Sequence, residues 1–212
     1  MSDAAAFYVI VRGPIGVGKT EVARRLARVL GALYISVDRI LDRHRLERWR
    51  NGFIAQASFR RSNVFVARAA APVLAAGRPV VVDGNFYWES QIEDLARRIR
   101  RPHLVASLDA PLRVCIARER GRGSNFGVAD VTAVYRKAMT VTAGVPIDAR
   151  GPVSSIVASI RALLPPQAPL ESGATKLRPP RVRKPALARS AVGAGAPGPR
   201  SNRRRPSLRR RR

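Results

Sequence analysis

Apolar and polar residues alternate over the first 164 positions in blocks that have the lengths of strands and helices. Short runs rich in β-branched and aromatic residues are typical of strands buried on both faces, and they predict strands at 7–12, 33–37, 80–82, 103–108 and 145–148. Between these runs, apolar residues recur every three or four positions, which is the helical period. This spacing predicts helices at 20–30, 38–50, 54–76, 88–100, 111–120, 128–141 and 152–164.

Strands that alternate with helices are typical of parallel crossovers, which place a helix layer on each face of a single sheet. We therefore predict an α/β fold with three layers and a five-stranded parallel sheet. Trp49, Trp88 and Cys115 are expected to pack against helix faces or the core. One cysteine also excludes an internal disulfide framework.

Charge and composition divide the chain of 212 residues, which carries a formal net charge of +26. Residues 165–212 hold 14 of the 40 Lys and Arg residues, a single acidic residue, Glu171, and no aromatic residue. Such a segment cannot bury enough apolar surface to offset its conformational entropy. The sequence therefore predicts a folded domain at 1–164 and a disordered, basic, proline-rich tail at 165–212.

The arginine clusters of this tail, at 203–205 and 209–212, are expected to attract polyanions without sequence preference. The excess of arginine over lysine is also what a GC-rich coding sequence produces without selection for any partner, so both interpretations stay open. No apolar run approaches the roughly 20 residues that cross a bilayer. A cytoplasmic protein without membrane contact is expected.

The segment that follows the first predicted strand matches G-x-x-x-x-G-K-[ST], the pattern of a phosphate-binding loop, or P-loop. It consists of Gly13, Pro14, Ile15, Gly16, Val17, Gly18, Lys19 and Thr20. In such a loop, backbone N–H groups surround the β-phosphate, the lysine reaches the β- and γ-phosphates, and the threonine hydroxyl binds Mg²⁺. The strand before it and the amphipathic helix after it are the context that this mechanism needs, so ATP and Mg²⁺ are the expected cofactors.

No Asn-Lys-x-Asp guanine motif is present, which argues against a GTPase, and the chain is short for a large AAA-type motor. Beyond the P-loop, the segments 36–39, 82–87, 110–119 and 147–149 follow the second to fifth predicted strands. This arrangement resembles small kinase-like P-loop ATPases, the relatives of zeta-toxin, chloramphenicol phosphotransferase, polynucleotide kinase and gluconate kinase. The resemblance covers residues 7–164 and implies the strand order 2-3-1-4-5 and transfer of the γ-phosphoryl group of ATP to a small-molecule hydroxyl or phosphate acceptor.

Two acidic residues are candidates for this chemistry. Asp38 matches the acceptor-side aspartate of these kinases, where a carboxylate orients the acceptor and takes its proton; alternatively it caps the next helix. Its neighbour Arg39 could bind an acidic acceptor or face solvent. Asp83 follows the most apolar strand and could hold Mg²⁺ together with Thr20, or form an Asp-Gly turn.

Further candidates lie after the third and fourth predicted strands. Asn85 and Tyr87 would line the acceptor pocket or cap the following helix. Arg118 precedes the glycine-rich break at 121–127 and Arg122 lies within it. This segment resembles the lid that closes over ATP in these kinases, where arginines bind the phosphates because guanidinium groups suit phosphate geometry. Arg150, in the loop expected near the adenine, is a weaker candidate.

Two other functions remain open. The protein could be a nucleic-acid-associated ATPase or polynucleotide kinase that holds its strand with the basic tail, or a nucleotide-binding regulator with little turnover. The sequence determines neither the acceptor nor the oligomeric state.

Overall fold

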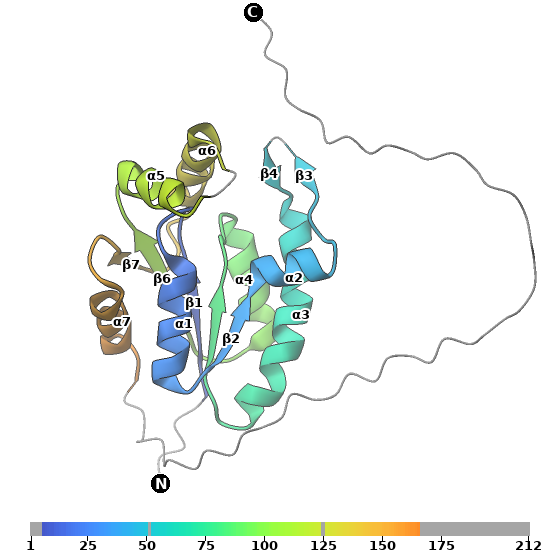
Figure 1. Ribbon diagram of the computed structural model, residues 1–212. Coiled ribbons are helices and arrows are strands. Elements are labelled where there is room, and N and C mark those ends of the chain that lie inside the picture. Colours follow the sequence, from blue (N-terminus) through green and yellow to red (C-terminus); the bar gives the residue numbers. More distant parts are fainter. Residues whose placement is uncertain (1–5, 51, 124–125, 166–212) are drawn as a thin grey trace, which may run out of the picture. The chain divides into compact units, whose positions relative to one another are not determined.

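Five parallel strands form the central sheet of the computed structural model, which describes residues 6–50, 52–123 and 126–165. The strands are β1 (Tyr8–Arg12), β2 (Leu33–Ser36), β5 (Val80–Asp83), β6 (His103–Asp109) and β7 (Val145–Asp148). They lie in the order β2-β5-β1-β6-β7 (Figure 1). Numbered among themselves along the chain, this is 2-3-1-4-5, so the predicted order is confirmed. The predicted tail lies outside the described residues, apart from Pro165.

Seven helices accompany these strands in the described part of the chain. They are α1 (Lys19–Leu30), α2 (Val37–Arg43), α3 (Gln56–Ala75), α4 (Glu89–Ile99), α5 (Leu112–Gly121), α6 (Val128–Met139) and α7 (Val153–Ala162). Six of them confirm the predicted helices to within about two residues at each end. The predicted end of the first helix is also confirmed, because Gly31 adopts a left-handed conformation, φ 59°, directly after Leu30.

The prediction of one helix over 38–50 is wrong in its second half. Helix α2 ends at Arg43, and the chain then forms a two-stranded antiparallel hairpin from β3 (Trp49–Arg50) and β4 (Phe53–Ile54). Arg45, at φ 51°, takes the chain out of the helix, and Gly52, at φ 79°, lies in the turn between the two strands. Because β3 and β4 belong to a separate sheet, they do not alter the order of the main one.

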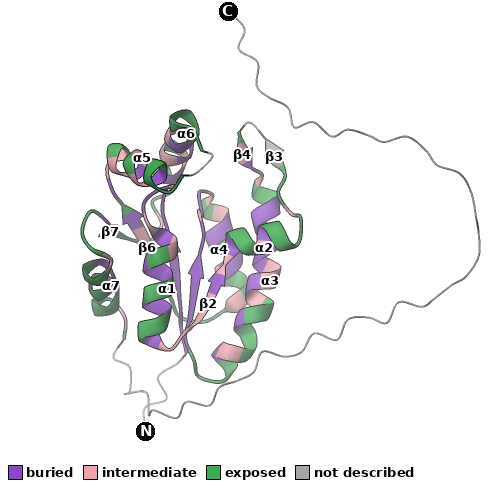
Figure 2. Ribbon diagram, in the orientation of Figure 1, coloured by how far each residue is buried: buried purple, intermediate pink, exposed green. Residues whose placement is uncertain are grey.

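The core consists of two apolar layers, one on each face of the sheet. In β1, Tyr8 and Ile10 point to the layer that α3 and α4 cover, whereas Val9 and Val11 point to the layer that α1 and α7 cover. This alternation explains why all four apolar residues of β1 are buried (Figure 2). None of the described helices is long and apolar enough to cross a membrane.

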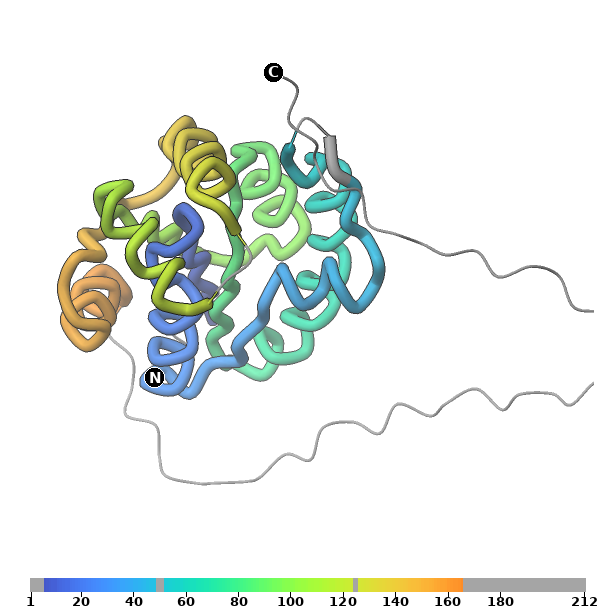
Figure 3. The backbone as a smooth tube through the Cα atoms, turned by 45° about the horizontal axis from the view of Figure 1, so that its top comes forward, coloured from blue at the N-terminus to red at the C-terminus, as the bar shows by residue number. Residues whose placement is uncertain are grey.

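Two groups of helices and strands lie at the edge of the sheet formed by the carboxyl ends of its strands. Helices α5 and α6 lie beyond one half of this edge, and α2 with the β3–β4 hairpin lies beyond the other half (Figures 1 and 3). Ligands of open α/β sheets bind at this edge. The fold therefore directs attention to the loops that leave β1, β2 and β5.

Candidate functional site

The P-loop at residues 13–18 connects β1 to α1, and its shape depends on glycine. Gly13 has φ 147° and Gly16 has φ 79°. A Cβ atom on Gly13 would lie 2.6 Å from the carbonyl oxygen of Leu108, and one on Gly16 would collide with the carbonyl group of Cys115. At the end of the loop, Gly18 caps α1 without a side chain, so the N-terminal N–H groups of α1 can bind an anion.

Lys19 lies at the floor of this loop with 8% of its surface exposed. Its ammonium group donates a hydrogen bond of 2.8 Å to the carbonyl oxygen of Pro14. Burial lowers the pKa of Lys19, whereas the nearby carboxylates of Asp83 and Asp38 act in the opposite direction. The structure therefore brings together one lysine and two acidic residues that the sequence singled out on three different segments.

Asp83 ends β5 beside β1, with 2% of its surface exposed. One carboxylate oxygen, Oδ2, accepts a hydrogen bond of 2.9 Å from the Tyr34 hydroxyl, while Oδ1 is buried without a partner among the described residues. A buried carboxylate oxygen without a donor suits a cation or a water bound to it. Tyr34 was not a sequence candidate, because its position in β2 gives no sign of a partner in β5.

A metal at this edge would have few protein ligands. In the described ranges, no group of three or more His, Cys, Asp or Glu residues could hold a metal ion. Magnesium at nucleotide sites usually binds through one or two protein oxygens, substrate phosphates and water. The Asp83 carboxylate and the Thr20 hydroxyl therefore fit a magnesium ion that arrives with a nucleotide.

Asp38 lies in the first turn of α2, and the structure removes its alternative role as the helix cap. The cap is Ser36, whose hydroxyl accepts a hydrogen bond from the backbone N–H of Arg39 at 3.4 Å. Asp38 is exposed to solvent, yet the surrounding protein desolvates its carboxyl group enough to raise its pKa, with Lys19 acting in the opposite direction. Asp38 is thus a carboxylate open to solvent beside the P-loop.

The other acceptor-side candidates are placed differently. Arg39 is exposed next to Asp38, and Asn85 is half-buried with no side-chain hydrogen bond to any described residue. Neither Asn85 nor Tyr87 caps α4, which begins after Trp88. The hydroxyl of Tyr87 accepts a hydrogen bond of 2.9 Å from the backbone N–H of Ile54.

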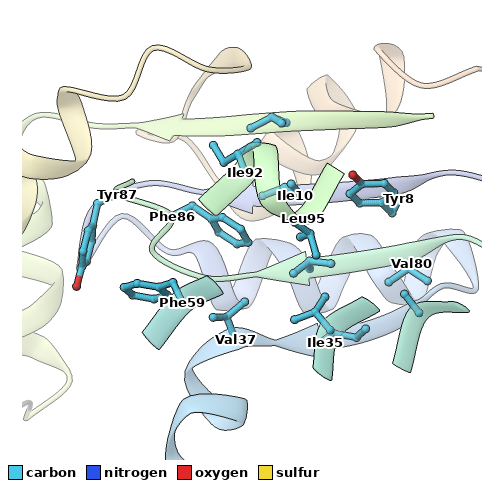
Figure 4. Close-up of a cluster of buried hydrophobic side chains, with 14 of the residues drawn as sticks. Tyr8, Ile10, Ile35, Val37, Phe59, Val80, Phe86, Tyr87, Ile92 and Leu95 are labelled. Atoms are coloured by element: carbon cyan, nitrogen blue, oxygen red, sulfur yellow. The ribbon is translucent and has the colours of Figure 1, made fainter. Parts of the chain in front are cut away.

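Tyr87 is 3% exposed, and its ring packs edge-on against Phe53 of the hairpin, Phe59 of α3 and Trp88. Figure 4 shows its ring at the margin of the buried cluster, with the hydroxyl pointing away from the other side chains. Burial raises the pKa of Tyr87 to about 12; the Ile54 hydrogen bond lowers it, and Asp38 raises it. The observed role of Tyr87 is therefore to anchor the hairpin rather than to expose its hydroxyl to an acceptor.

The two arginines that the sequence predicts for a lid, Arg118 and Arg122, lie beside the P-loop. Arg118, on α5, donates hydrogen bonds to the carbonyl oxygens of Val17 at 2.9 Å and Arg150 at 3.4 Å. Arg122 caps α5 and forms an ion pair with Glu119 at 3.6 Å, although half of its side chain is exposed. The side chain of Arg150 binds its own neighbour, Asp148, at 2.7 Å.

A large basic cavity adjoins the P-loop along α1. It has a volume of about 910 Å³ and is lined by Thr20, Glu21, Arg24, Arg25, Arg28, Arg122, Val153 and Ser154. The three α1 arginines form no ion pair within the described residues, so their charge is available to an anion. The helical period alone places these arginines on the outer face of α1; the cavity appears only when α7 and the end of α5 are folded against that helix.

The chain matches one protein family and resembles several solved structures. A sequence profile described as an AAA domain matches residues 9–145. The chain belongs to this family. Among solved structures, a sugar kinase from Janibacter has a TM-score of 0.61 and 19% sequence identity, with 74% of this chain and 92% of that chain covered.

Two further structures have the same fold. A gluconokinase from Sinorhizobium meliloti has a TM-score of 0.60 and 18% identity, over 74% of this chain and 90% of that one. A shikimate kinase from Aquifex aeolicus has a TM-score of 0.51 and 16% identity, over 74% of this chain and 94% of that one. The predicted family resemblance is confirmed: the chain is a P-loop kinase or ATPase with the fold of small kinases.

Proposed function

We propose that the protein transfers the γ-phosphoryl group of ATP, as its magnesium complex, to a hydroxyl or phosphate group of a small molecule. One observation carries this proposal. Two carboxylates lie at the edge of the sheet that holds the P-loop: Asp38 in the first turn of α2, and Asp83 at the end of β5, whose buried Oδ1 has no partner among the described residues. A kinase needs both, because one acidic group serves the metal and the other serves the acceptor.

In this proposal, the P-loop and Lys19 bind the β- and γ-phosphates of ATP. Thr20 and Asp83 hold the magnesium ion, which neutralises charge on the phosphates when it is bound. Arg118 and Arg122 complete the cationic surroundings from the lid. Each group acts mainly by position and charge, since the loose transition state of phosphoryl transfer demands little covalent chemistry from the protein.

Asp38 then acts on the acceptor. The acceptor oxygen attacks the γ-phosphorus, the bond to the oxygen bridging the β- and γ-phosphates breaks, and ADP leaves. The proton of an attacking hydroxyl passes to the Asp38 carboxylate. The raised pKa of Asp38 supports this role, because a more basic carboxylate is a better proton acceptor once it is ionised.

The acceptor side would be formed by α2 and the hairpin. Arg39 follows Asp38 in α2, Asn85 follows Asp83 after β5, and Tyr87 holds the hairpin through its hydrogen bond from the Ile54 N–H. Arginine beside the proton acceptor favours an acceptor that carries an anionic group, because a guanidinium group pairs well with carboxylate or phosphate.

The direct test is acceptor-stimulated release of ADP from Mg·ATP across sugars, sugar acids, nucleosides, aminoglycosides and oligonucleotide ends. Stimulation by one small-molecule class, with the phosphorylated product identified by mass spectrometry, supports the proposal. Stimulation only by oligonucleotide ends would replace it with the polynucleotide kinase alternative. ATP binding without turnover against the whole panel would replace it with the regulator.

A further inference from the structure

An arginine is buried immediately before the P-loop. Arg12, the last residue of β1, is 3% exposed, and no carboxylate in the described ranges lies within ion-pair distance of it. Burial lowers its pKa to about 10, against a smaller raising effect of Glu89. It therefore stays protonated at neutral pH, and a buried cation persists only where hydrogen-bond acceptors surround it.

Those acceptors come from three separate segments. The Arg12 guanidinium group donates to the carbonyl oxygens of Ala138 at 2.6 Å and Val141 at 3.2 Å, at the C-terminal end of α6. It also donates to the Ser107 hydroxyl in β6 at 2.9 Å and to the Phe86 carbonyl oxygen at 3.2 Å. The end of a helix is where carbonyl groups lack partners and negative potential accumulates, so Arg12 stabilises the end of α6 from outside the helix.

The Phe86 contact fixes an unusual backbone. Phe86 has φ 43°, a conformation that residues with a Cβ atom rarely adopt. Its ring is fully buried and points into the cluster that contains Ile10 and Leu95 (Figure 4). The buried Phe86 ring and the hydrogen bond from Arg12 to the Phe86 carbonyl oxygen together hold the strained loop between β5 and α4.

A second contact joins the same two segments nearer the surface. The ammonium group of Lys137, on α6, lies 3.8 Å from the centre of the Trp88 ring. A cation over an aromatic face at this distance is attracted to it. The indole N–H of Trp88 in turn donates to the carbonyl oxygen of Ile54, in the hairpin, at 3.3 Å.

These contacts form a continuous connection from the C-terminal end of α6 to the acceptor side. The last turn of α6 is bound to residues 86–88 twice, by Arg12 and by Lys137. Residues 86–88 are bound to Ile54 of the hairpin twice, by the hydroxyl of Tyr87 and the indole of Trp88. We propose that Arg12 and the Lys137–Trp88 pair are positioning residues that couple movement of helices α5 and α6 to the acceptor-side hairpin.

The coupling deepens the proposed function and rests on it. If Mg·ATP draws Arg118 and Arg122 onto its phosphates, α5 moves and α6 moves with it. The two attachments transmit that movement to residues 86–88 and the hairpin. Binding of the donor would thereby shape the acceptor side before transfer, which limits wasteful hydrolysis by water.

Trp88 itself is the natural probe. The chain has two tryptophans, so a Trp49→Phe background leaves Trp88 as the sole emitter. Because an ammonium group lies over its ring, movement of α6 changes the polarity around the indole and hence its emission. Titration with Mg·ATP alone should give a saturable change in Trp88 emission at the same concentrations that stabilise the protein against heat.

Three variants separate coupling from simple folding effects. Lys137→Met should abolish the nucleotide-dependent emission change and weaken Mg·ATP binding by at most about 2- to 5-fold, which is the full value of one such contact. Lys137→Arg, which keeps a cation over the ring, should restore both. Arg136→Met is the matched control, because Arg136 is the neighbouring exposed cation on α6 and has no side-chain partner among the described residues; it should behave as the parent.

Arg12→Lys tests the buried connection. One ammonium group cannot reach four acceptors on three segments, so this variant should keep its helix content, bind Mg·ATP more weakly and lose the emission change. If Arg12→Lys does not fold, the Lys137 variants still decide whether the coupling exists.

Binding of Mg·ATP without any change in Trp88 emission, or an unaltered response in Lys137→Met, would overturn the coupling alone. Absence of Mg·ATP binding in the parent would overturn the proposed function and the coupling with it.

Discussion

Replacing Asp38 with asparagine separates the chemistry of this residue from its place in the fold. Asparagine has nearly the same shape but cannot take a proton. If the Asp38 carboxylate is the acceptor-side base, the substitution should lower acceptor turnover by about 10²–10⁴-fold, equivalent to about 3–5 kcal/mol of activation free energy. Affinity for Mg·ATP should change little, because the P-loop, Thr20 and Asp83 are untouched.

The structure predicts a small effect of the same substitution on stability. Asp38 does not cap α2, since Ser36 does, so no capping hydrogen bond is lost. An acidic residue in the first turn of a helix contributes about 0.3–1 kcal/mol, which asparagine forfeits. Opposing this, the raised pKa of Asp38 means that its ionised form costs stability at neutral pH.

The direction in which pH changes the contribution of Asp38 to stability follows from proton binding. The folded state keeps the Asp38 proton to higher pH than the unfolded state, so this residue's contribution to stability falls as pH rises from the ordinary value of 3.8 through the raised one. The asparagine variant has no such dependence. The two effects oppose each other, and the melting temperature should move by less than about 4 °C.

The assay combines acceptor turnover across pH with thermal unfolding. Asp42→Asn is the control, because Asp42 is an exposed acidic residue on the same helix and should alter neither turnover nor its pH dependence. In the parent, turnover should fall on the acid side at a pH above that of an ordinary aspartate, and this decline should vanish in Asp38→Asn. Near-native turnover in Asp38→Asn would refute the assignment of Asp38 as the base.

Two further substitutions and one truncation test other parts of the site. In thermal unfolding, Gly16→Ala should lower the melting temperature by roughly 2–8 °C and abolish Mg·ATP binding, because its Cβ collides with Cys115 and its φ is 79°. Gly151→Ala, which has open space around it, should do neither. Asp83→Asn keeps an acceptor for Tyr34 but should raise the magnesium concentration needed for activity by about 10- to 100-fold; an unchanged requirement removes Asp83 from the metal site. A chain ending at Leu164 should lose most binding to RNA and DNA, which falls steeply with salt, and keep its activity on small acceptors; loss of that activity would favour the nucleic-acid alternative.

The fold and the P-loop were predictable because their signals are local. Strand β1 is a short apolar run, α1 has a clear helical period, and the eight residues from Gly13 to Thr20 carry a pattern that constrains backbone shape directly. The strand order required the family resemblance, because hydrophobic runs reveal strands but not their neighbours in the sheet.

Features that depend on distant partners could not be predicted in this way. The hairpin at 49–54 is held by Tyr87 and Trp88, 33 and 34 residues away, and its own residues show no clear strand period. Arg12 is bonded to residues 74 to 129 positions away, so in the sequence it is one arginine among many. The only signal was a charged residue at the end of a strand that is otherwise apolar.

The two interpretations of Asp38 show a different obstacle. Ser36 and Asp38 are both good cap residues, and the sequence places them two positions apart at the start of a helix. Only the position at which the backbone enters the helix decides which one caps it. The structure assigns the cap to Ser36 and leaves the Asp38 carboxylate available.

Thermal unfolding with and without Mg·ATP tests the central claim most directly. At a concentration of 100 times its dissociation constant, a ligand that binds only the folded state stabilises it by about 2.7 kcal/mol, which for a domain of this size corresponds to roughly 5–11 °C. The native protein should show this saturable increase, and Lys19→Ala, which still unfolds cooperatively, should lose nearly all of it. An equal increase in Lys19→Ala, or none in the native protein, would contradict the assignment of residues 13–20 as a functional nucleotide site.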